Sequence, residues 1–406
     1  MVLRIFNSLT HRKDPFPWPI GGGVKFFVCG PTVYDYVHLG HARTYLAFDM
    51  ITRYLQFRGY KVTYVMNITD VADRLIQKAE ELKRDPLQIA REYETAFRED
   101  MQALGVKNVT SYERASDYIP QIIAQITGLI SKGVAYETET GVYFEVGKFP
   151  AFGQLSGQTR EELGLRRLEL CSSKRNVEDF SLWRKHDSGL RWDSPWGQGR
   201  PGWHVEDTAI SMTRLGETYD LHGGASELIF PHHEAEIAQA EALTGKSPFV
   251  KFWLHTGLLS VKGRKMSKSL GNVIRIRDAL RYYSASDLRY YFASFHYRKP
   301  VVLSDSALKL ASSQLAKILT HFDNFLAREP ISRSDGRKVA RLAHTSERQF
   351  THFMNDDFNT PMALKVLGKL AEAMDGLSRK GVVNERTKVE VQERFRRMAN
   401  VFGILE

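Results

Sequence analysis

Residues 24–31 read VKFFVCGP, and this stretch decides the fold of the N-terminal part of the chain. Its β-favouring residues run directly into Cys29-Gly30-Pro31, which predicts a short strand that ends in a turn. Apolar residues at helical spacing follow over 40–57, and a second strand is predicted at 61–67. A strand, a helix and a strand of these lengths predict a βαβ unit, and therefore a parallel sheet with a ligand site at the carboxyl ends of its strands.

The pattern beyond this unit predicts that the sheet is interrupted and then resumes. Residues 85–131 are expected to be mostly helical, and 134–146 alternate as in a hairpin. The stretch 150–202 is rich in Gly, Pro, Ser and Trp, which indicates an irregular insertion. Strand-like runs at 218–229 and 249–260, on either side of a helical pattern, predict the second half of the same sheet.

From residue 304 onward the composition changes to helices. An apolar stripe from Leu308 to Leu326 predicts the first of them. Thr360-Pro361 begins a second helix that runs to Leu377, and a third is predicted at 385–402. The predicted fold class is therefore α/β, with a split Rossmann-like parallel-sheet domain that contains an insertion and is followed by an α-helical bundle.

The composition limits the class of protein. Of the 406 residues 43% are hydrophobic, so we expect a globular core rather than disorder. Lys and Arg (57) outnumber Asp and Glu (47), and this net charge of +10 favours a polyanionic partner such as nucleic acid. No apolar run reaches the roughly 18 residues of a membrane span, and the N-terminus lacks the apolar block of a signal peptide. We therefore expect a cytoplasmic protein.

Two cysteines, Cys29 and Cys171, are too few for a disulfide framework.

Two short motifs carry the chemistry. His38-Leu39-Gly40-His41 stands where the first helix begins, and the amides and dipole of a helix N-terminus favour an anionic phosphate there. Its two imidazoles can donate to negative charge that develops on such a phosphate. Lys265-Met266-Ser267-Lys268-Ser269 offers two ammonium groups that suit a triphosphate and a departing pyrophosphate. Either motif alone is also explained by exposed polar residues. Their occurrence together, at the ends of two half-sheets, indicates a nucleotide site.

With these motifs the chain resembles the cysteinyl-tRNA synthetases, a family of class I aminoacyl-tRNA synthetases, over nearly its whole length. The resemblance rests on Phe27 to Asp35, Asn67 to Asp70, Lys174 to Asn176 with Asp179-Phe180, Gly199 to His204, Phe230 to Glu234, and Lys265 to Asn272. It implies that ATP, with Mg²⁺, and an amino acid form an aminoacyl adenylate and pyrophosphate. The acyl group then passes to an acceptor.

The resemblance also assigns roles to single residues. Those expected to stabilise the phosphate transition state are His38, His41, Lys265 and Lys268. The ATP site would add Gly40, Met266, Ser267 and Ser269. Those expected around the amino acid are Cys29, Gly30, Thr32, Thr69, Trp203 and His222, although ordinary packing would also explain Trp203.

A metal site is implied, with one departure from the family. In that family two Cys, one His and one Glu hold a zinc ion that binds the substrate thiolate. The matching residues here are Cys29, His232 and Glu236, and Asp207 stands in place of the second Cys. Asp is a known zinc ligand, but the altered set is harder and favours a thiolate less. Three alternatives stay open: retained zinc with an altered substrate preference, no metal with Asp207 paired to a different amino acid, and a purely structural Asp207.

The C-terminus is a second departure. Family members continue past the bundle into a small module that reads the anticodon, whereas this sequence stops at Glu406, where the last predicted helix ends. We therefore expect a monomer that charges the tRNA 3′ end without reading the anticodon. The alternatives are a tRNA-independent ligase that acts on a small amine, like the similar mycothiol-pathway cysteine ligase, and an inactive paralogue that binds RNA or a protein partner.

By the same resemblance the chain divides into five segments. They are the first half of the catalytic domain at 1–84, an inserted acceptor-side domain at 85–200, the second half of the catalytic domain at 201–260, a connecting segment with the lysine motif at 261–303, and the helical bundle at 304–406.

Overall fold

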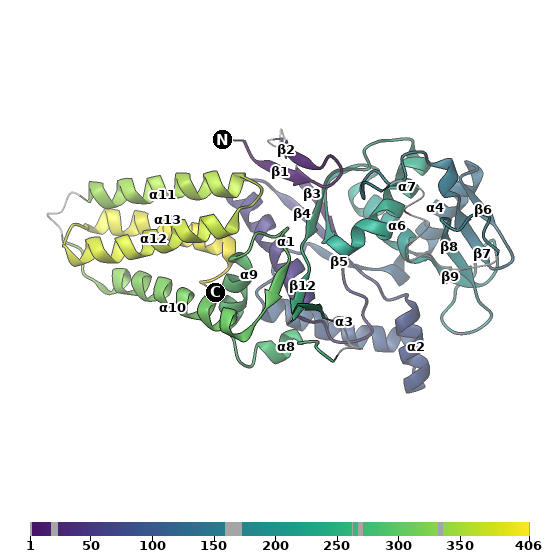
Figure 1. Cartoon of the computed structure of the whole chain (residues 1–406), viewed down its shortest axis with the longest axis horizontal. Coiled ribbons are helices and arrows are strands. Elements are labelled where there is room, and N and C mark those ends of the chain that lie inside the picture. The colour runs from purple at the N-terminus through teal and green to yellow at the C-terminus, as the bar shows by residue number, and fades with distance from the viewer. Residues whose placement is uncertain are drawn as a thin grey trace.

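A five-stranded parallel sheet lies between an α/β insertion and a helical bundle (Figure 1). The computed structural model describes residues 2–17, 23–158, 173–261, 263–266, 271–331 and 336–405. In spatial order the strands of the sheet are β11 (Val250–Thr256), β10 (Tyr219–Ala225), β3 (Val24–Val28), β4 (Val62–Ile68) and β5 (Ser111–Arg114). Every neighbouring pair is parallel. The predicted sheet, assembled from two separate parts of the chain, is confirmed.

The central strand β3 marks the point where the chain changes direction across the sheet. From β3 the chain adds β4 and then β5 on one side, whereas β10 and β11, which come after the insertion, lie on the other. In such sheets the crevice at the carboxyl ends of the strands, next to this point, is where ligands bind. Cys29 follows β3 directly, so its place in the chain puts it at this crevice.

Alternation along β3 sends neighbouring side chains to opposite faces of the sheet. Phe26 and Val28 belong to the core that includes α1 (Leu39–Phe57). Phe27 and Cys29 belong to a second core, formed with α6 (Trp203–Leu215) and α7 (Glu234–Thr244). Cys29 therefore faces the helices that follow the insertion.

The insertion contains helices and an antiparallel sheet. The helix α4 (Ile119–Ser131) packs in its core, whereas α2 (Asp73–Leu82) and α3 (Pro86–Ala103) pack in the core that includes α1. Its sheet has the order β6 (Ala135–Glu137), β7 (Gly141–Phe144), β8 (Phe180–Lys185) and β9 (Gly199–Pro201). The hairpin predicted at 134–146 is confirmed as β6 and β7.

One detail of the prediction is wrong in this part of the chain. The stretch 150–202 is not irregular throughout, because β8 and β9 extend the hairpin into a four-stranded sheet in which Trp183 is fully buried. The stretch 85–131 is mostly helical, as predicted, but it also contains β5 at residues 111–114. This edge strand reads Ser-Tyr-Glu-Arg and is only half-buried, so it lacks the apolar run of an inner strand.

Shorter elements join the sheet to the bundle. They are the hairpin of β1 (Arg4–Asn7) and β2 (Arg12–Pro15), the small sheet of β12 (Leu259–Val261), β13 (Arg264–Lys265) and β14 (Val301–Leu303), and the helices α8 (Ile276–Ala279) and α9 (Ala285–Ala293). The bundle itself is built from α10 (Asp305–Ala327), α11 (Arg337–Asn355), α12 (Thr360–Arg379) and α13 (Glu385–Phe402), drawn from green to yellow in Figure 1.

The predicted bundle is confirmed, but α11 was not among its three predicted helices. Its buried positions, such as Val339 and Phe350, are separated by many charged and polar residues, so its apolar stripe is weak in the sequence. In the part of the chain that the structure describes, no helix is both long and apolar enough to cross a membrane.

A buried arginine links the end of the bundle helix α13 to α1. Arg289 of α9 is 1% exposed and donates to Asp49 Oδ2 of α1 at 2.5 Å and to the carbonyl of Phe402 at 2.6 Å.

Replacing Arg289 with methionine would leave the negative charge of the buried Asp49 carboxylate with one ion-pair partner fewer. We expect a loss of about 3 kcal/mol in the free energy of unfolding, measured by urea denaturation. Replacing the exposed Arg281 with methionine is the matched control; equal stability of the two variants would contradict this role of Arg289.

Candidate active site

Two histidines cap the first turn of α1. His38 Nδ1 accepts from the backbone N–H of Gly40 at 3.1 Å, and His41 Nδ1 accepts from the backbone N–H of His38 at 3.2 Å. The two ring centroids are 4.0 Å apart. A neutral imidazole that accepts at Nδ1 carries its proton on Nε2. Both rings can therefore donate from Nε2 toward an anion at this helix N-terminus.

The segment around the lysine motif lies against this helix end. The backbone N–H of Leu39 donates to the carbonyl of Ile274 at 2.9 Å. Met266 is buried, and a Cβ added to Gly40 would come within 3.3 Å of its Cε. The two motifs, more than 200 residues apart in sequence, thus meet at one site. The other predicted residues of the lysine motif, Ser267, Lys268 and Ser269, lie outside the described residues, as do Cys171 and the side chain of Lys265.

The ends of β3 and β4 are joined by Asn67. Its Oδ1 accepts from the backbone N–H of Gly30 at 2.6 Å, and its Nδ2 donates to Thr69 Oγ1 at 3.2 Å and to Asp207 Oδ1 at 2.6 Å. Thr32 pairs with Thr69 in a parallel bridge just beyond the strands. The structure therefore brings Gly30, Thr32 and Thr69, all predicted for the amino-acid pocket, together at one edge of the sheet.

The other predicted pocket residues lie around Cys29. His222, on β10, is fully buried, and its Nε2 lies 3.3 Å from Cys29 Sγ. Tyr219 Oη lies 2.7 Å from His222 Nδ1 and fixes the orientation of that ring. Trp203 is 42% exposed and stacks on His232, with ring centroids 4.3 Å apart. Its exposure shows that it is not an ordinary core aromatic.

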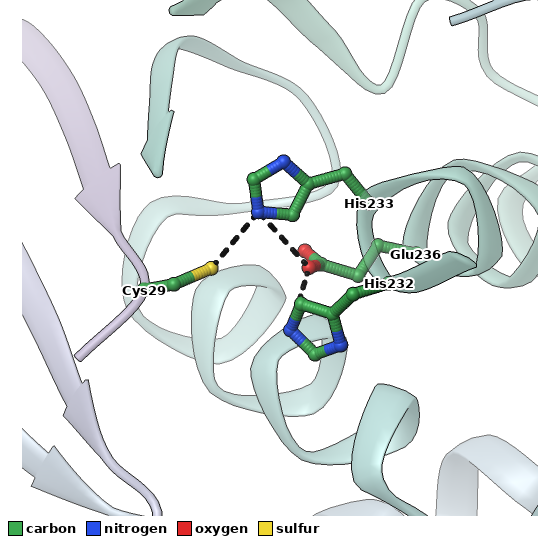
Figure 2. A group of neighbouring side chains, drawn as sticks. All are labelled: Cys29, His232, His233 and Glu236. Atoms are coloured by element: carbon green, nitrogen blue, oxygen red, sulfur yellow. Dashed lines mark hydrogen bonds and ion pairs between the residues drawn. The ribbon is translucent and has the colours of Figure 1, made fainter. Parts of the chain in front are cut away.

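Figure 2 shows four buried side chains that converge on one point: Cys29, His232, His233 and Glu236. Cys29 comes from the end of β3, and the other three come from α7 and the turn before it. Their candidate ligand atoms all lie within 4.8 Å of one another. His233 Nε2 is 3.1 Å from Cys29 Sγ, and His232 Nε2 is 3.3 Å from Glu236 Oε1.

The environment of Glu236 fits a bound cation. Among the described residues no group forms a hydrogen bond to either carboxylate oxygen of this fully buried side chain. Burial and the nearby Asp207 raise the pKa of Glu236 well above its usual value. A buried carboxylate without donors is costly unless a cation neutralises it. Thiolate, imidazole and carboxylate donors around one point fit a divalent transition metal.

Comparisons with known proteins agree with this geometry. Residues 19–313 match the family described as tRNA synthetases class I (C) catalytic domain, and residues 349–406 match the DALR domain. The chain is 45% identical over 414 residues to the cysteine–tRNA ligase of Pyrococcus furiosus. The alignment covers 100% of this chain and 87% of that protein. The chain belongs to the cysteine–tRNA ligase family. The cysteine–tRNA ligase of Thermococcus onnurineus is 43% identical, and the alignment covers 100% of this chain and 87% of that protein. The cysteine–tRNA ligase of Desulfitobacterium hafniense is 40% identical, and the alignment covers 92% of this chain and 80% of that protein.

Solved structures of class I synthetases share the fold. The LeuRS of Agrobacterium radiobacter K84, in a complex with tRNA and LeuAMS, superposes with a TM-score of 0.69 over 96% of this chain and 84% of its own, at 12% identity. The methionyl-tRNA synthetase of Mycobacterium tuberculosis, in complex with methionyl-adenylate, superposes with a TM-score of 0.67 over 94% of this chain and 90% of its own, at 16% identity. As a member of the cysteine–tRNA ligase family the chain is a ligase of class I, and the resemblance expected from its motifs is confirmed.

For a cysteine–tRNA ligase the position of Asp207 is the notable feature. Asp207 is 1% exposed, and its Oδ2 lies 3.1 Å from His232 Nε2, so the carboxylate points toward the buried group. The structure brings Cys29, His232 and Glu236 together as predicted for the metal site and sets Asp207 beside them. It also adds His233, which the sequence prediction did not include.

His233 and its neighbours form a buried set of neutral imidazoles. Burial lowers the pKa of His204, His222 and His233 well below the usual value, and it lowers the pKa of His255 to about 3. At neutral pH these rings therefore carry no charge and keep a lone pair. In the sequence, the string from Phe230 to Glu234 contains the signal for His233. The family set contains one His, however, and the match assigned that place to His232.

Proposed function

We propose that this chain activates cysteine with ATP and transfers the acyl group to tRNA. The identity of 43–45% to named cysteine–tRNA ligases over the whole chain supports this assignment. The observation that carries it is the buried group around Cys29, because it offers a metal-binding set for a thiol beside the expected amino-acid pocket. His38 and His41, 4.0 Å apart at the start of α1, would donate to the reacting phosphate. A Cβ at Gly40 would lie 2.8 Å from His38 and 3.3 Å from Met266, so the lack of a side chain there would let ATP approach the helix end closely.

The remaining groups have proposed roles in the same reaction. Lys265 and Lys268, with Ser267 and Ser269, would bind the triphosphate of ATP and stabilise the leaving pyrophosphate. Gly30, Thr32, Thr69, Trp203 and His222 would surround the amino acid. Cys29, His232 and Glu236 would hold zinc, with Asp207 or His233 as the fourth protein ligand. A zinc ion there would act as a Lewis acid that favours the thiolate form of a substrate thiol.

The acceptor is proposed to be tRNA rather than a small amine. Residues 349–406 match the DALR domain, and the relatives named above are tRNA ligases. The net charge of +10 suits a polyanionic acceptor. The inactive-paralogue alternative is less favoured because the two signature motifs are whole in the sequence.

The direct test is amino-acid-dependent ATP–pyrophosphate exchange with all common amino acids, together with the zinc content of the purified protein. We expect exchange with cysteine, about one zinc per chain, and at least about 100-fold weaker exchange with serine, whose hydroxyl is a poorer zinc ligand. Charging of total tRNA with cysteine is the second readout. Exchange with a different amino acid, or with none, would contradict the proposed function.

A further inference from the structure

We infer that His233, rather than Asp207, is the fourth protein ligand of the zinc site. The set would then be Cys29, His232, His233 and Glu236. In this set the imidazole of His233, the residue after His232, takes the place of the second cysteine thiolate of the family. This inference rests on the proposed function, which places zinc at this site.

The distances support this set. His233 Nε2 lies 3.1 Å from Cys29 Sγ and 4.0 Å from Glu236 Oε1, and His232 Nε2 lies 3.3 Å from the same carboxylate oxygen. Ligand atoms bound to one tetrahedral zinc at about 2.0–2.3 Å are separated by roughly 3.3–3.7 Å. The observed separations lie close to that range. Figure 2 shows the two imidazoles on either side of the Glu236 carboxylate, with the Cys29 sulfur facing His233.

Nδ1 of His232 and Nδ1 of His233 each lie within hydrogen-bond distance of another buried histidine. His233 Nδ1 lies 2.8 Å from His255 Nε2, and His255 Nδ1 lies 2.7 Å from Ser8 Oγ. His232 Nδ1 lies 2.9 Å from His204 Nδ1. Metal-binding imidazoles are commonly oriented through a hydrogen bond at their other ring nitrogen. His233 has this arrangement, with Nε2 directed at the buried group.

Asp207 is already engaged elsewhere. Its Oδ1 accepts from Asn67 Nδ2 at 2.6 Å, and the Oδ1 of Asn67 in turn accepts from the backbone N–H of Gly30. Asp207 therefore ties α6 to the ends of β3 and β4. Its Oδ2 lies 3.1 Å from His232 Nε2. Asp207 is nevertheless not part of the group of described side chains whose ligand atoms all lie within 4.8 Å of one another, whereas His233 is. Glu236, in contrast, has no such donor among the described residues and is left to a cation.

The choice of ligand changes the charge of the site. Zinc with the Cys29 thiolate, the Glu236 carboxylate and two neutral imidazoles has a formal charge of zero. A set with Asp207 in place of His233 would carry one negative charge. A site with less negative charge binds a substrate thiolate more readily, because like charges disfavour its ionised form. Two imidazoles thus keep the site suited to cysteine although one cysteine ligand has been lost.

X-ray absorption at the zinc edge tests this assignment on the unmodified, zinc-loaded protein. We expect scattering from one sulfur and from two imidazole rings. One sulfur with a single imidazole would overturn the inference and leave the proposed function intact. A protein that binds no zinc would also overturn it. The proposed function is read separately, in cysteine-dependent exchange.

Two variants provide an independent test by competition with a zinc chelator. We expect His233→Gln to weaken zinc affinity by more than about 100-fold, since loss of an outer partner alone costs about 10- to 100-fold. Asp207→Asn keeps the shape of the side chain, and we expect a loss of about 10- to 100-fold, that of an outer partner. A larger loss for Asp207→Asn than for His233→Gln would reverse the assignment. If His233→Gln does not fold, the absorption spectrum and Asp207→Asn still decide.

Discussion

Replacing His41 with asparagine is expected to slow cysteine-dependent ATP–pyrophosphate exchange by about 100- to 1,000-fold, as the loss of one preorganised donor does at other sites of developing charge. His41 stands in the first turn of α1 and uses Nδ1 to accept from the backbone N–H of His38. Its Nε2–H is the group assigned to the reacting phosphate. Asparagine retains a side-chain oxygen near the Nδ1 position but has nothing at Nε2, so the helix cap is kept and the donor is lost.

The control for this experiment is the same substitution at an exposed histidine. His344, whose side chain is 55% exposed in the bundle, lies 3.0 Å from Glu390 and far from α1 in sequence. We expect His344→Asn to exchange at the wild-type rate and both variants to unfold at the wild-type temperature. Wild-type exchange in His41→Asn would show that His41 serves only as a helix cap. A lower unfolding temperature for that variant alone would point to a structural role.

The inner strands of the fold could be predicted from sequence because they are buried on both faces. β3 and β4 contain residues such as Phe27 and Met66 that are fully buried, and the corresponding runs of sequence are apolar enough to be recognised. β5 could not be predicted, because it is short and its Ser-Tyr-Glu-Arg side chains are only half-buried. β8 could not be predicted either. Its short apolar run follows a long stretch rich in polar and small residues, and its pairing with β7 and β9 is seen only in the structure.

The candidate site shows the same limit at the level of single residues. Cys29, His232 and Glu236 were predicted because their spacing matches a family pattern, and the geometry supports placing them together. His233 was not predicted, because the family set contains one His and the match assigned that place to His232. The turn before α7 is not a regular α-helix, since Phe230 within it has extended backbone angles. Only the three-dimensional path of that turn brings both rings to Glu236.

Gly30→Ala is expected to abolish most of the activity through the backbone alone. A Cβ added at Gly30 would lie 1.7 Å from the carbonyl oxygen of Asn67, a distance that no rotamer can relieve because the neighbour is backbone. The ends of β3 and β4 must therefore move apart. That movement would break the hydrogen bond from the backbone N–H of Gly30 to Asn67 Oδ1 and shift Cys29, the preceding residue, relative to His222.

The size of the expected loss of exchange follows from how strongly the reaction rate depends on the positions of the reacting groups. A misplacement of about 1 Å can cost about 100-fold in rate, so we expect exchange to fall by at least that factor and zinc to be retained less tightly. Gly376→Ala, on α12, is the matched control, because a Cβ there meets no atom within 4 Å and alanine favours a helix. Exchange and zinc content at wild-type levels in Gly30→Ala would mean that the strand ends separate freely without disturbing the site. The close approach of β3 to β4 would then not be what positions Cys29.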